Sequence, residues 1–177
     1  DNAVAAIGGN DTIFDVWALD GGYSGADHVS AGAGNDLIVS SLDGGNNQYF
    51  GDEGIDTINF IPSAAGVAVS LTSGIARNIL NGEASTVGTI ENVTGSAHND
   101  IIFGNAGVNV LRGYNGVDNI YGEAGSDTIF GGRGIDGLSG GAQNDYLYGE
   151  DDADSLYGGA GSDVLDGGNG DDKLSGG

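Results

Sequence analysis

Hydrophobic residues recur at one fixed interval through the second half of the chain. From Gly95 to Ser175 the sequence divides into nine consecutive blocks of nine residues, and the eighth place of every block is Ile or Leu. These residues are Ile102, Leu111, Ile120, Ile129, Leu138, Leu147, Leu156, Leu165 and Leu174. Because successive side chains of a strand point to opposite faces, places seven to nine predict a short strand whose middle residue points inward.

The first six places of each block predict a turn. Place one is always Gly, and Gly is frequent at places two and four, which suits a backbone that must visit positive φ. Place six is polar in every block: Asp100, Asn109, Asp118, Asp127, Asp136, Asp145, Asp154, Asp163 and Asp172. A period of this strictness predicts an all-β solenoid, in which two blocks form one coil of eighteen residues with two facing strands.

Stacked coils would place each sixth-place Asp above the Asp eighteen residues away, at one strand spacing of about 4.8 Å. Carboxylates that close repel one another unless a cation lies between them. Sites made only of carboxylate and carbonyl oxygens suit a hard ion with six to eight ligands, which favours calcium over magnesium. The spacing therefore predicts columns of calcium sites.

A looser version of the same period runs from Gly22 to Asn59. Its sixth places are Asp27, Asp36, Asn47 and Asp56, and its eighth places are Val29, Ile38, Tyr49 and Ile58. Two further sites are predicted, from the pairs 27/47 and 36/56. The first pair is the weaker one, because Asn47 is neutral and the extra residues Ser40 and Ser41 disturb the stacking.

The chain is expected to divide into a cap at 1–21, a first roll at 22–59, irregular wider β coils at 60–94 and the main roll at 95–177. In the cap, Phe14, Val16, Trp17 and Leu19 would close the open sheet end, and Asp11 stands in a clipped block whose phase does not continue. Between 60 and 94, Val67, Val69 and Leu71 alternate with small or polar residues as in a half-buried strand. Glu91 is either a stray calcium ligand or a solvated side chain.

These blocks resemble the RTX (repeats-in-toxin, hemolysin-type) nonapeptide G-G-x-G-x-D-x-U-x. The resemblance is strong from Gly95 to Gly177 and looser from Gly22 to Asn59. The order VAVSLTSG, GTIENVTGS and then repeats is similar to the segment that precedes the repeats in serralysin-type proteases and alginate epimerase modules. The family implies a right-handed parallel β-roll with two nonapeptides per coil and calcium between turns.

The resemblance also implies a ligand set. One turn would supply the carbonyls of places two and four with its Asp, and its partner turn the carbonyls of places one and three with its Asp. Seven pairs of turns fit in the main roll, from 100/118 to 154/172, which with the first roll gives about seven to nine Ca²⁺ ions. Two of these sites would join Gly132, Gly134 and Asp136 to Gly149, Asp151 and Asp154, and Glu123, Gly125 and Asp127 to Gly140, Ala142 and Asp145. The glycines expected to take part are Gly107, Gly116, Gly125, Gly132, Gly134, Gly140, Gly149, Gly158 and Gly161.

The net charge of −22 supports a role for cations. Only Arg77, Arg112, Arg133 and Lys173 are basic, and 37 of the 177 residues are Gly. Such acidity is also typical of a disordered or solubilising chain, but here the Asp residues fall in phase. Without calcium the charges oppose collapse, so metal binding is expected to supply much of the folding free energy.

Composition excludes several functions. Nucleic acid is not expected as a partner, because few basic residues could pair with phosphates. No apolar run approaches eighteen residues, so no membrane span is expected, and the absence of cysteine excludes disulfides. The only histidines, His28 and His98, form no zinc motif, and no catalytic residues are predicted. The expected location is outside the cell or at its surface, and the resemblance implies a bacterial protein exported by a type I system.

Several roles stay open for such a roll. It could stabilise or present the remainder of a parent protein, act as an adhesin, surface-layer or self-assembly module, or serve as an accessory domain of a secreted enzyme that modifies polysaccharide or protein. The mixed third places of the blocks argue against an ice-binding face. Outward ninth places carry aromatic residues that either stack across strands or form a contact strip for sugar or another protein domain. These are Phe103, Tyr121 and Tyr157 on one sheet, and Phe130 and Tyr148 on the other.

Overall fold

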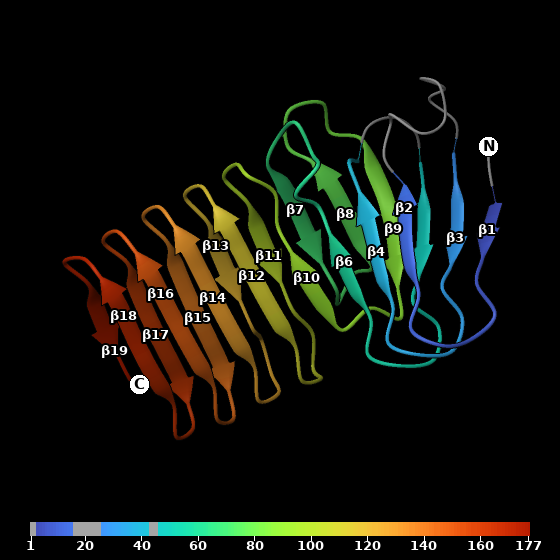
Figure 1. Cartoon of the computed structure of the whole chain (residues 1–177). Coiled ribbons are helices and arrows are strands. Elements are labelled where there is room, and N and C mark those ends of the chain that lie inside the picture. The colour runs from blue at the N-terminus through green and yellow to red at the C-terminus, as the bar shows by residue number, and fades with distance from the viewer. Residues whose placement is uncertain (1–2, 16–25, 43–45) are drawn as a thin grey trace.

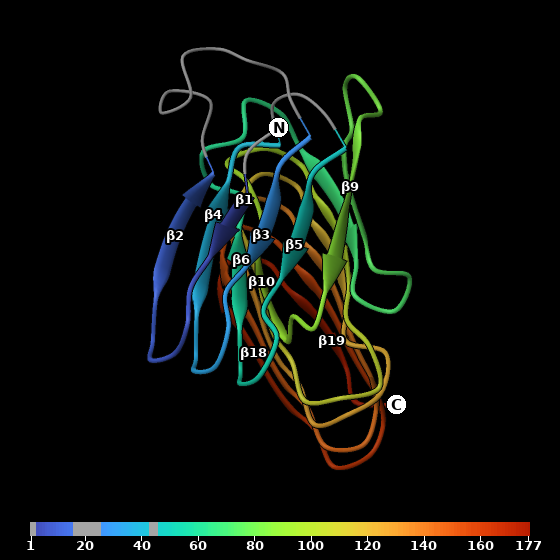
Figure 2. The ribbon, with the colours of Figure 1, turned by 90° about the vertical axis from the view of Figure 1, so that its right-hand side faces the viewer.

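The chain winds between two β-sheets, and successive strands of the main roll alternate between them. The computed structural model describes residues 3–15, 26–42 and 46–177, and none of these lies in a helix. Figure 1 shows the strands in rows from β1 at one end to β19 at the other, and Figure 2 shows β2 and β4 on one side of the roll and β5 and β9 on the other. The sequence prediction of an all-β parallel β-roll is confirmed.

The longer sheet contains eleven strands and the shorter sheet eight. In spatial order the longer sheet is β1 (Ala3–Ala5), β3 (His28–Ser30), β5 (Gln48–Phe50), β9 (Ala84–Gly88), β8 (Ile75–Asn78), β7 (Val67–Ser70), β11 (Ile101–Phe103), β13 (Asn119–Tyr121), β15 (Gly137–Ala142), β17 (Ser155–Ala160) and β19 (Lys173–Ser175). The shorter sheet is β18 (Val164–Asn169), β16 (Tyr146–Asp151), β14 (Thr128–Arg133), β12 (Val110–Asn115), β10 (Asn92–Thr94), β6 (Thr57–Asn59), β4 (Leu37–Ser40) and β2 (Thr12–Asp15).

Eighth-place side chains form the core of the main roll. In the longer sheet Ile102, Ile120 and Leu138 are in register, followed by Leu156 and Leu174. The matching row of the shorter sheet is Leu111, Ile129, Leu147 and Leu165. All but the last residue of each row are buried, and Leu174 is 49% exposed. One apolar residue per block is therefore enough to fill this thin interior.

The segment at 60–94 interrupts the parallel order in the longer sheet. β7 pairs parallel with β11 and β9 pairs parallel with β5, but β8 lies antiparallel between β7 and β9. In the shorter sheet β10 lies parallel between β6 and β12, so that sheet is continuous. The alternation of Val67 and Val69 predicts strand character, but it cannot specify a reversal of chain direction.

The first described residues extend both sheets. β1 pairs parallel with β3 and β2 with β4, which places Ile13 beside Ile38 in the eighth-place row. Phe14 is 58% exposed, whereas Val16, Trp17 and Leu19 lie outside the described residues. Capping by the segment 1–21 stays a prediction.

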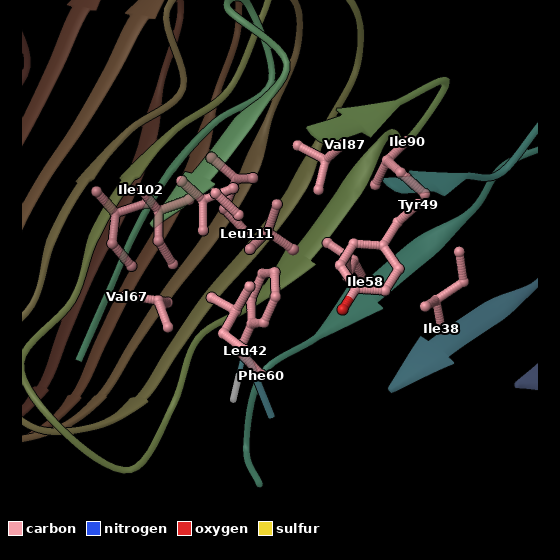
Figure 3. Close-up of a cluster of buried hydrophobic side chains, with 14 of the residues drawn as sticks. Ile38, Leu42, Tyr49, Ile58, Phe60, Val67, Val87, Ile90, Ile102 and Leu111 are labelled. Atoms are coloured by element: carbon pink, nitrogen blue, oxygen red, sulfur yellow. The ribbon is translucent and has the colours of Figure 1, made fainter. Parts of the chain in front are cut away.

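Tyr49, the one aromatic residue at an eighth place, is completely buried in the core. Its ring lies among Leu42, Ile38, Ile58 and Phe60 (Figure 3). The hydroxyl donates to Asp15, accepts from Asn47 Nδ2 at 2.9 Å, and lies 2.8 Å from Ser40 Oγ. Burial and then Asp15 raise the pKa of Tyr49, which keeps it neutral. The two-residue insertion at 40–41 thus supplies a polar partner for a core side chain larger than Ile or Leu.

Candidate metal centres

The sixth-place residues of the main roll form two carboxylate ladders, one along each row of turns. Each backbone N–H donates to the Oδ1 atom of the sixth-place residue on the next coil, at 2.7–3.0 Å. The pairs joined in this way are 100/118, 109/127, 118/136, 127/145, 136/154, 145/163 and 154/172. All seven predicted pairs are therefore brought together by the fold.

The second carboxylate oxygen of most ladder residues has no partner among the described residues. The buried Oδ2 atoms without a hydrogen bond belong to Asp36, Asp56, Asp118, Asp127, Asp136, Asp145, Asp154 and Asp163. A buried charged oxygen without a hydrogen bond is strongly destabilising. A row of such atoms fits a cation that the turns are built to hold.

Place-one glycines show where the unpartnered oxygens point. A Cβ on Gly131 would stand 2.5 Å from Asp136 Oδ2 and 2.8 Å from the Gly149 carbonyl oxygen of the next coil. Gly131 has no positive φ, so space rather than backbone conformation requires glycine here. The carboxylate of one turn and the carbonyl of the next thus converge on the same point, as a shared site between turns requires.

From the third block of the main roll onward, places two and four of the turns adopt left-handed backbone conformations. Gly132 and Gly134 have φ of 118° and 123°, and this geometry persists where the residue is not glycine. The non-glycine examples in the main roll are Tyr114, Glu123, Gln143, Glu150 and Asp152, with φ from 76° to 87°. The turn conformation is therefore imposed by stacking on neighbouring coils, even at a strained residue.

Replacing Gln143 by glycine is expected to stabilise the roll. Its φ of 81° is a conformation that strains most residues but not glycine, so Gln143→Gly should raise the free energy of unfolding by about 1 kcal/mol. Gln48→Gly is the matched control, because Gln48 lies in β5 and glycine weakens a strand. Denaturant unfolding at fixed calcium should move the two midpoints in opposite directions; a lower midpoint for Gln143→Gly would contradict the strain.

Burial perturbs the ladder carboxyls. Desolvation raises the pKa of Asp118, Asp127 and Asp136 to about 7, and neighbouring carboxylates such as Asp154 beside Asp136 add to it. Backbone N–H donors to the same groups act in the opposite direction but do not offset burial. The pKa values of Asp56, Asp100, Asp145 and Asp154 are also raised, first by desolvation. The ladder therefore favours a proton or a cation over bare negative charge.

This perturbation predicts a pH dependence in calcium-free buffer. The folded pKa of about 7 at Asp118, Asp127 and Asp136 exceeds the ordinary value of 3.8, so the folded state binds more protons between those limits. Stability should then fall as pH rises from about 4 to 7 and stay low above it. Circular dichroism in calcium-stripped buffer should show more strand signal at pH 5.5 than at pH 8. The Asp118→Asn/Asp127→Asn/Asp136→Asn triple variant should lose most of that difference, and a larger signal at pH 8 would contradict the prediction.

The donor set points to a hard cation held partly by the backbone. No three Asp, Glu or His side chains converge into one group anywhere in the described residues. Each site can thus draw only one or two carboxylates, and the remaining ligands must be turn carbonyls. That mixture of oxygens is typical of calcium.

The ladders continue into the first roll. Asp36 N donates to Asp56 Oδ1 at 2.7 Å, and Asp27 N donates to Asn47 Oδ1 at 2.9 Å. The side-chain amide nitrogen of Asn47 donates to the Tyr49 hydroxyl. Asn47 therefore directs a hydrogen-bond donor toward the core, at the position where an aspartate would have its second acceptor oxygen. Asp11, whose N–H donates to Asp36 Oδ1 at 2.7 Å, also joins the ladder. The incomplete block that contains Asp11 therefore stacks on the first roll, contrary to the sequence prediction. The sequence did not show this, because Asp11 and Asp36 are 25 residues apart, a spacing that differs from the period of the repeats.

Asn109, the one exception among the sixth places, meets a different partner. Its amide nitrogen donates to the Glu91 carbonyl oxygen at 2.8 Å, which a carboxylate could not do. Its Oδ1 accepts the Asn105 N–H at 2.9 Å. The neutral amide therefore matches the non-repeat segment that precedes the main roll.

Outward aromatic side chains stack across strands. Phe103 lies on Tyr121 with ring centroids 4.8 Å apart, and Phe130 lies on Tyr148 at 5.1 Å. The Arg112 guanidinium covers Phe130 at 4.8 Å. Because these faces cover one another, cross-strand stacking accounts for both pairs, and a contact strip stays a prediction.

A parallel β-roll with carboxylate ladders along its turns defines a calcium-binding repeat protein. The family model described as RTX calcium-binding nonapeptide repeat (4 copies) matches residues 21–58, 94–129, 103–138, 121–156, 130–165 and 148–177. The chain therefore belongs to the RTX calcium-binding repeat family, which confirms the resemblance. Comparison with curated proteins gives no match.

Membership of this family has several direct consequences. The RTX repeat binds calcium, and it is a structural module rather than a catalytic one. Proteins with such repeats are typically type I secreted and fold on extracellular calcium. Within the described part of the chain, no helix has the length and apolar character to cross a membrane.

Proposed function

We propose that this chain is the calcium-responsive folding module of a bacterial type I secreted protein. The observation that carries the proposal is the set of buried Oδ2 atoms that lack a partner among the described residues. At low intracellular calcium these carboxylates repel one another and oppose folding. Outside the cell, calcium neutralises them and lets the roll form, which stabilises or presents the parent protein.

The turns would hold the ions between consecutive coils. The best-supported sites are those whose two aspartates both carry an unpartnered Oδ2 within the described chain: 36/56, 118/136, 127/145, 136/154 and 145/163. Carbonyl oxygens of the turns complete each site. Bound calcium supplies positive charge to oxygens that have no donor, and each ion joins two coils. With the remaining predicted pairs the total is about seven to nine ions.

Substitution of an aspartate that is shared between two proposed sites tests the proposed function. Asp136 belongs to both 118/136 and 136/154, so Asp136→Asn should lower the number of bound ions by up to two. It should also raise the calcium concentration at the folding midpoint by about tenfold, because affinity follows the number of charged ligands. Equilibrium dialysis measures bound calcium and circular dichroism measures folding.

Asp166→Asn is the control for this variant. Asp166 is exposed and its side chain accepts the Gly168 N–H at 3.1 Å, so the variant removes the same charge outside the ladders. It should leave the ion count unchanged. Equal ion counts for Asp136→Asn and wild type would contradict the proposed function.

A further inference from the structure

Four neighbouring strands of the shorter sheet present an outward face with little charge. β12, β14, β16 and β18 lie at one end of that sheet (Figure 1), and places seven and nine of their blocks point away from the inward eighth-place row. In register, place seven gives the row Val110, Thr128, Tyr146 and Val164, and place nine gives the row Arg112, Phe130, Tyr148 and Asp166. This four-strand face has no net charge, although the chain as a whole has a net charge of −22.

Large side chains of the four-strand face are open to solvent. Tyr146 and Val164 lie side by side in register and are 49% and 48% exposed. Phe130 and Tyr148 stack on one another but stay partly accessible. The equivalent face of the longer sheet, from β13 to β19, is mainly small or polar: Asn119, Gly137, Ser155 and Lys173 at place seven, and Tyr121, Ser139, Tyr157 and Ser175 at place nine. The apolar patch thus belongs to one face only, and a contiguous exposed patch is typical of a contact surface.

The two charged side chains of the four-strand face stand at opposite ends of one row. Arg112 is on β12 and Asp166 is on β18, with the stacked rings of Phe130 and Tyr148 between them. Both charged residues are exposed, and neither forms an ion pair with another described residue. The Arg112 guanidinium lies 4.8 Å from the centre of the Phe130 ring, and Asp166 accepts the Gly168 N–H at 3.1 Å. The row therefore runs from a positive end through an aromatic centre to a negative end.

A row of this kind is complementary to a second copy of itself. In a twofold dimer the same surface patch serves both subunits. If the axis runs parallel to the strands and passes between β14 and β16, β12 of one protomer lies against β18 of its partner. Arg112 then meets Asp166 of the partner at both ends, and Phe130 meets Tyr148 of the partner at the centre. An axis across the strands would set β12 against β12 and leave both charges without an opposite partner.

We propose that this chain forms a twofold-symmetric dimer through the four-strand face and that calcium controls its formation. The inference rests on the proposed function, because the two rows come into register only in the folded roll. Calcium also neutralises most of the negative charge that would keep two copies of the chain apart. The chain should therefore be dimeric with calcium and monomeric in chelator.

Sedimentation equilibrium of the full chain at saturating calcium measures the dissociation constant of the dimer. Asp166→Arg should raise that constant by about tenfold or more, because it sets two arginines against each other at both ends of the interface. The Arg112→Asp/Asp166→Arg double variant restores opposite charges and should return the constant to near the wild-type value. A constant for Asp166→Arg equal to that of wild type, or to that of the double variant, would overturn the assignment of this face.

Two exposed tyrosines give a second test that changes no charge. Tyr146→Ala removes a large side chain from the four-strand face and should raise the dissociation constant by about tenfold. Tyr157, 51% exposed on β17 of the longer sheet, is the matched control. Tyr157→Ala should dimerise as wild type does, and equal losses for the two variants would contradict the proposed interface.

Calcium binding separates a failure of the dimer from a failure of the proposed function. Equilibrium dialysis should give the same number of bound ions for wild type and Asp166→Arg, because Asp166 lies outside the ladders. A folded chain that binds calcium but stays monomeric at every protein concentration would overturn the dimer and leave the proposed function intact. A dimer that persists in chelator with full strand signal would contradict calcium control and the proposed function itself.

Discussion

Removal of calcium is expected to abolish the strand signal of this chain at pH 7.5. Eight buried Oδ2 atoms lack a hydrogen bond within the described residues, and an ionised group buried without compensation costs several kcal/mol. A whole domain is stable by only about 5–15 kcal/mol. The summed cost of burying the uncompensated ladder carboxylates therefore exceeds the stability that the thin core could supply, and the calcium-free chain should be disordered.

A calcium titration followed by circular dichroism checks this expectation. Strand signal should be absent in chelator and should appear cooperatively, because each inner ladder aspartate belongs to two successive proposed sites. Magnesium at the same concentration is the control; it prefers strict octahedral geometry and keeps its water, so it should restore little signal. A full strand signal in chelator at this pH would contradict calcium-dependent folding.

Among glycine-to-alanine substitutions in the turns, Gly134→Ala is expected to cause the largest loss of unfolding free energy. The added Cβ would overlap the Gly116 carbonyl oxygen of the preceding coil, and the φ of 123° is a conformation that residues with a Cβ rarely adopt. Both effects act together on packed backbone that cannot move aside. The loss of unfolding free energy should be about 3 kcal/mol or more, with a higher calcium midpoint for folding.

Two alanine variants separate this effect from the loss of glycine in general. Gly107 occupies the same fourth place, but its Cβ would meet only the flexible Asn105 side chain, at 3.1 Å, and its φ is not left-handed. Gly176→Ala meets nothing within 4 Å. Thermal unfolding at saturating calcium should show a large loss for Gly134→Ala, a small one for Gly107→Ala and none for Gly176→Ala. Equal losses at Gly134 and Gly107 would contradict the steric argument.

Place-one glycines illustrate a difference between pattern and cause. The strict recurrence of Gly131 and its equivalents predicts a turn, and positive φ is the usual reason for glycine in a turn. The structure gives another reason, because Gly131 lacks positive φ and leaves room for Asp136 Oδ2 and the Gly149 carbonyl. A one-dimensional pattern records that a side chain is excluded but not which atoms exclude it.

The sequence by itself determined the strands of the main roll, their eighth-place core and the seven stacked pairs of sixth-place residues. It could do so because a fixed period in parallel coils brings like residues into register without further information. Only the tertiary structure decided the reversal at β8, the inward amide of Asn47 and the entry of Asp11 and Glu91 into the ladders. The ladder bonds of Asn47, Asp11 and Glu91 join residues 20–35 apart outside any common period, whereas the reversal pairs β8 with the neighbouring strand β7. Their partners are set by where neighbouring strands place backbone N–H and carbonyl groups, and the local sequence does not encode that placement.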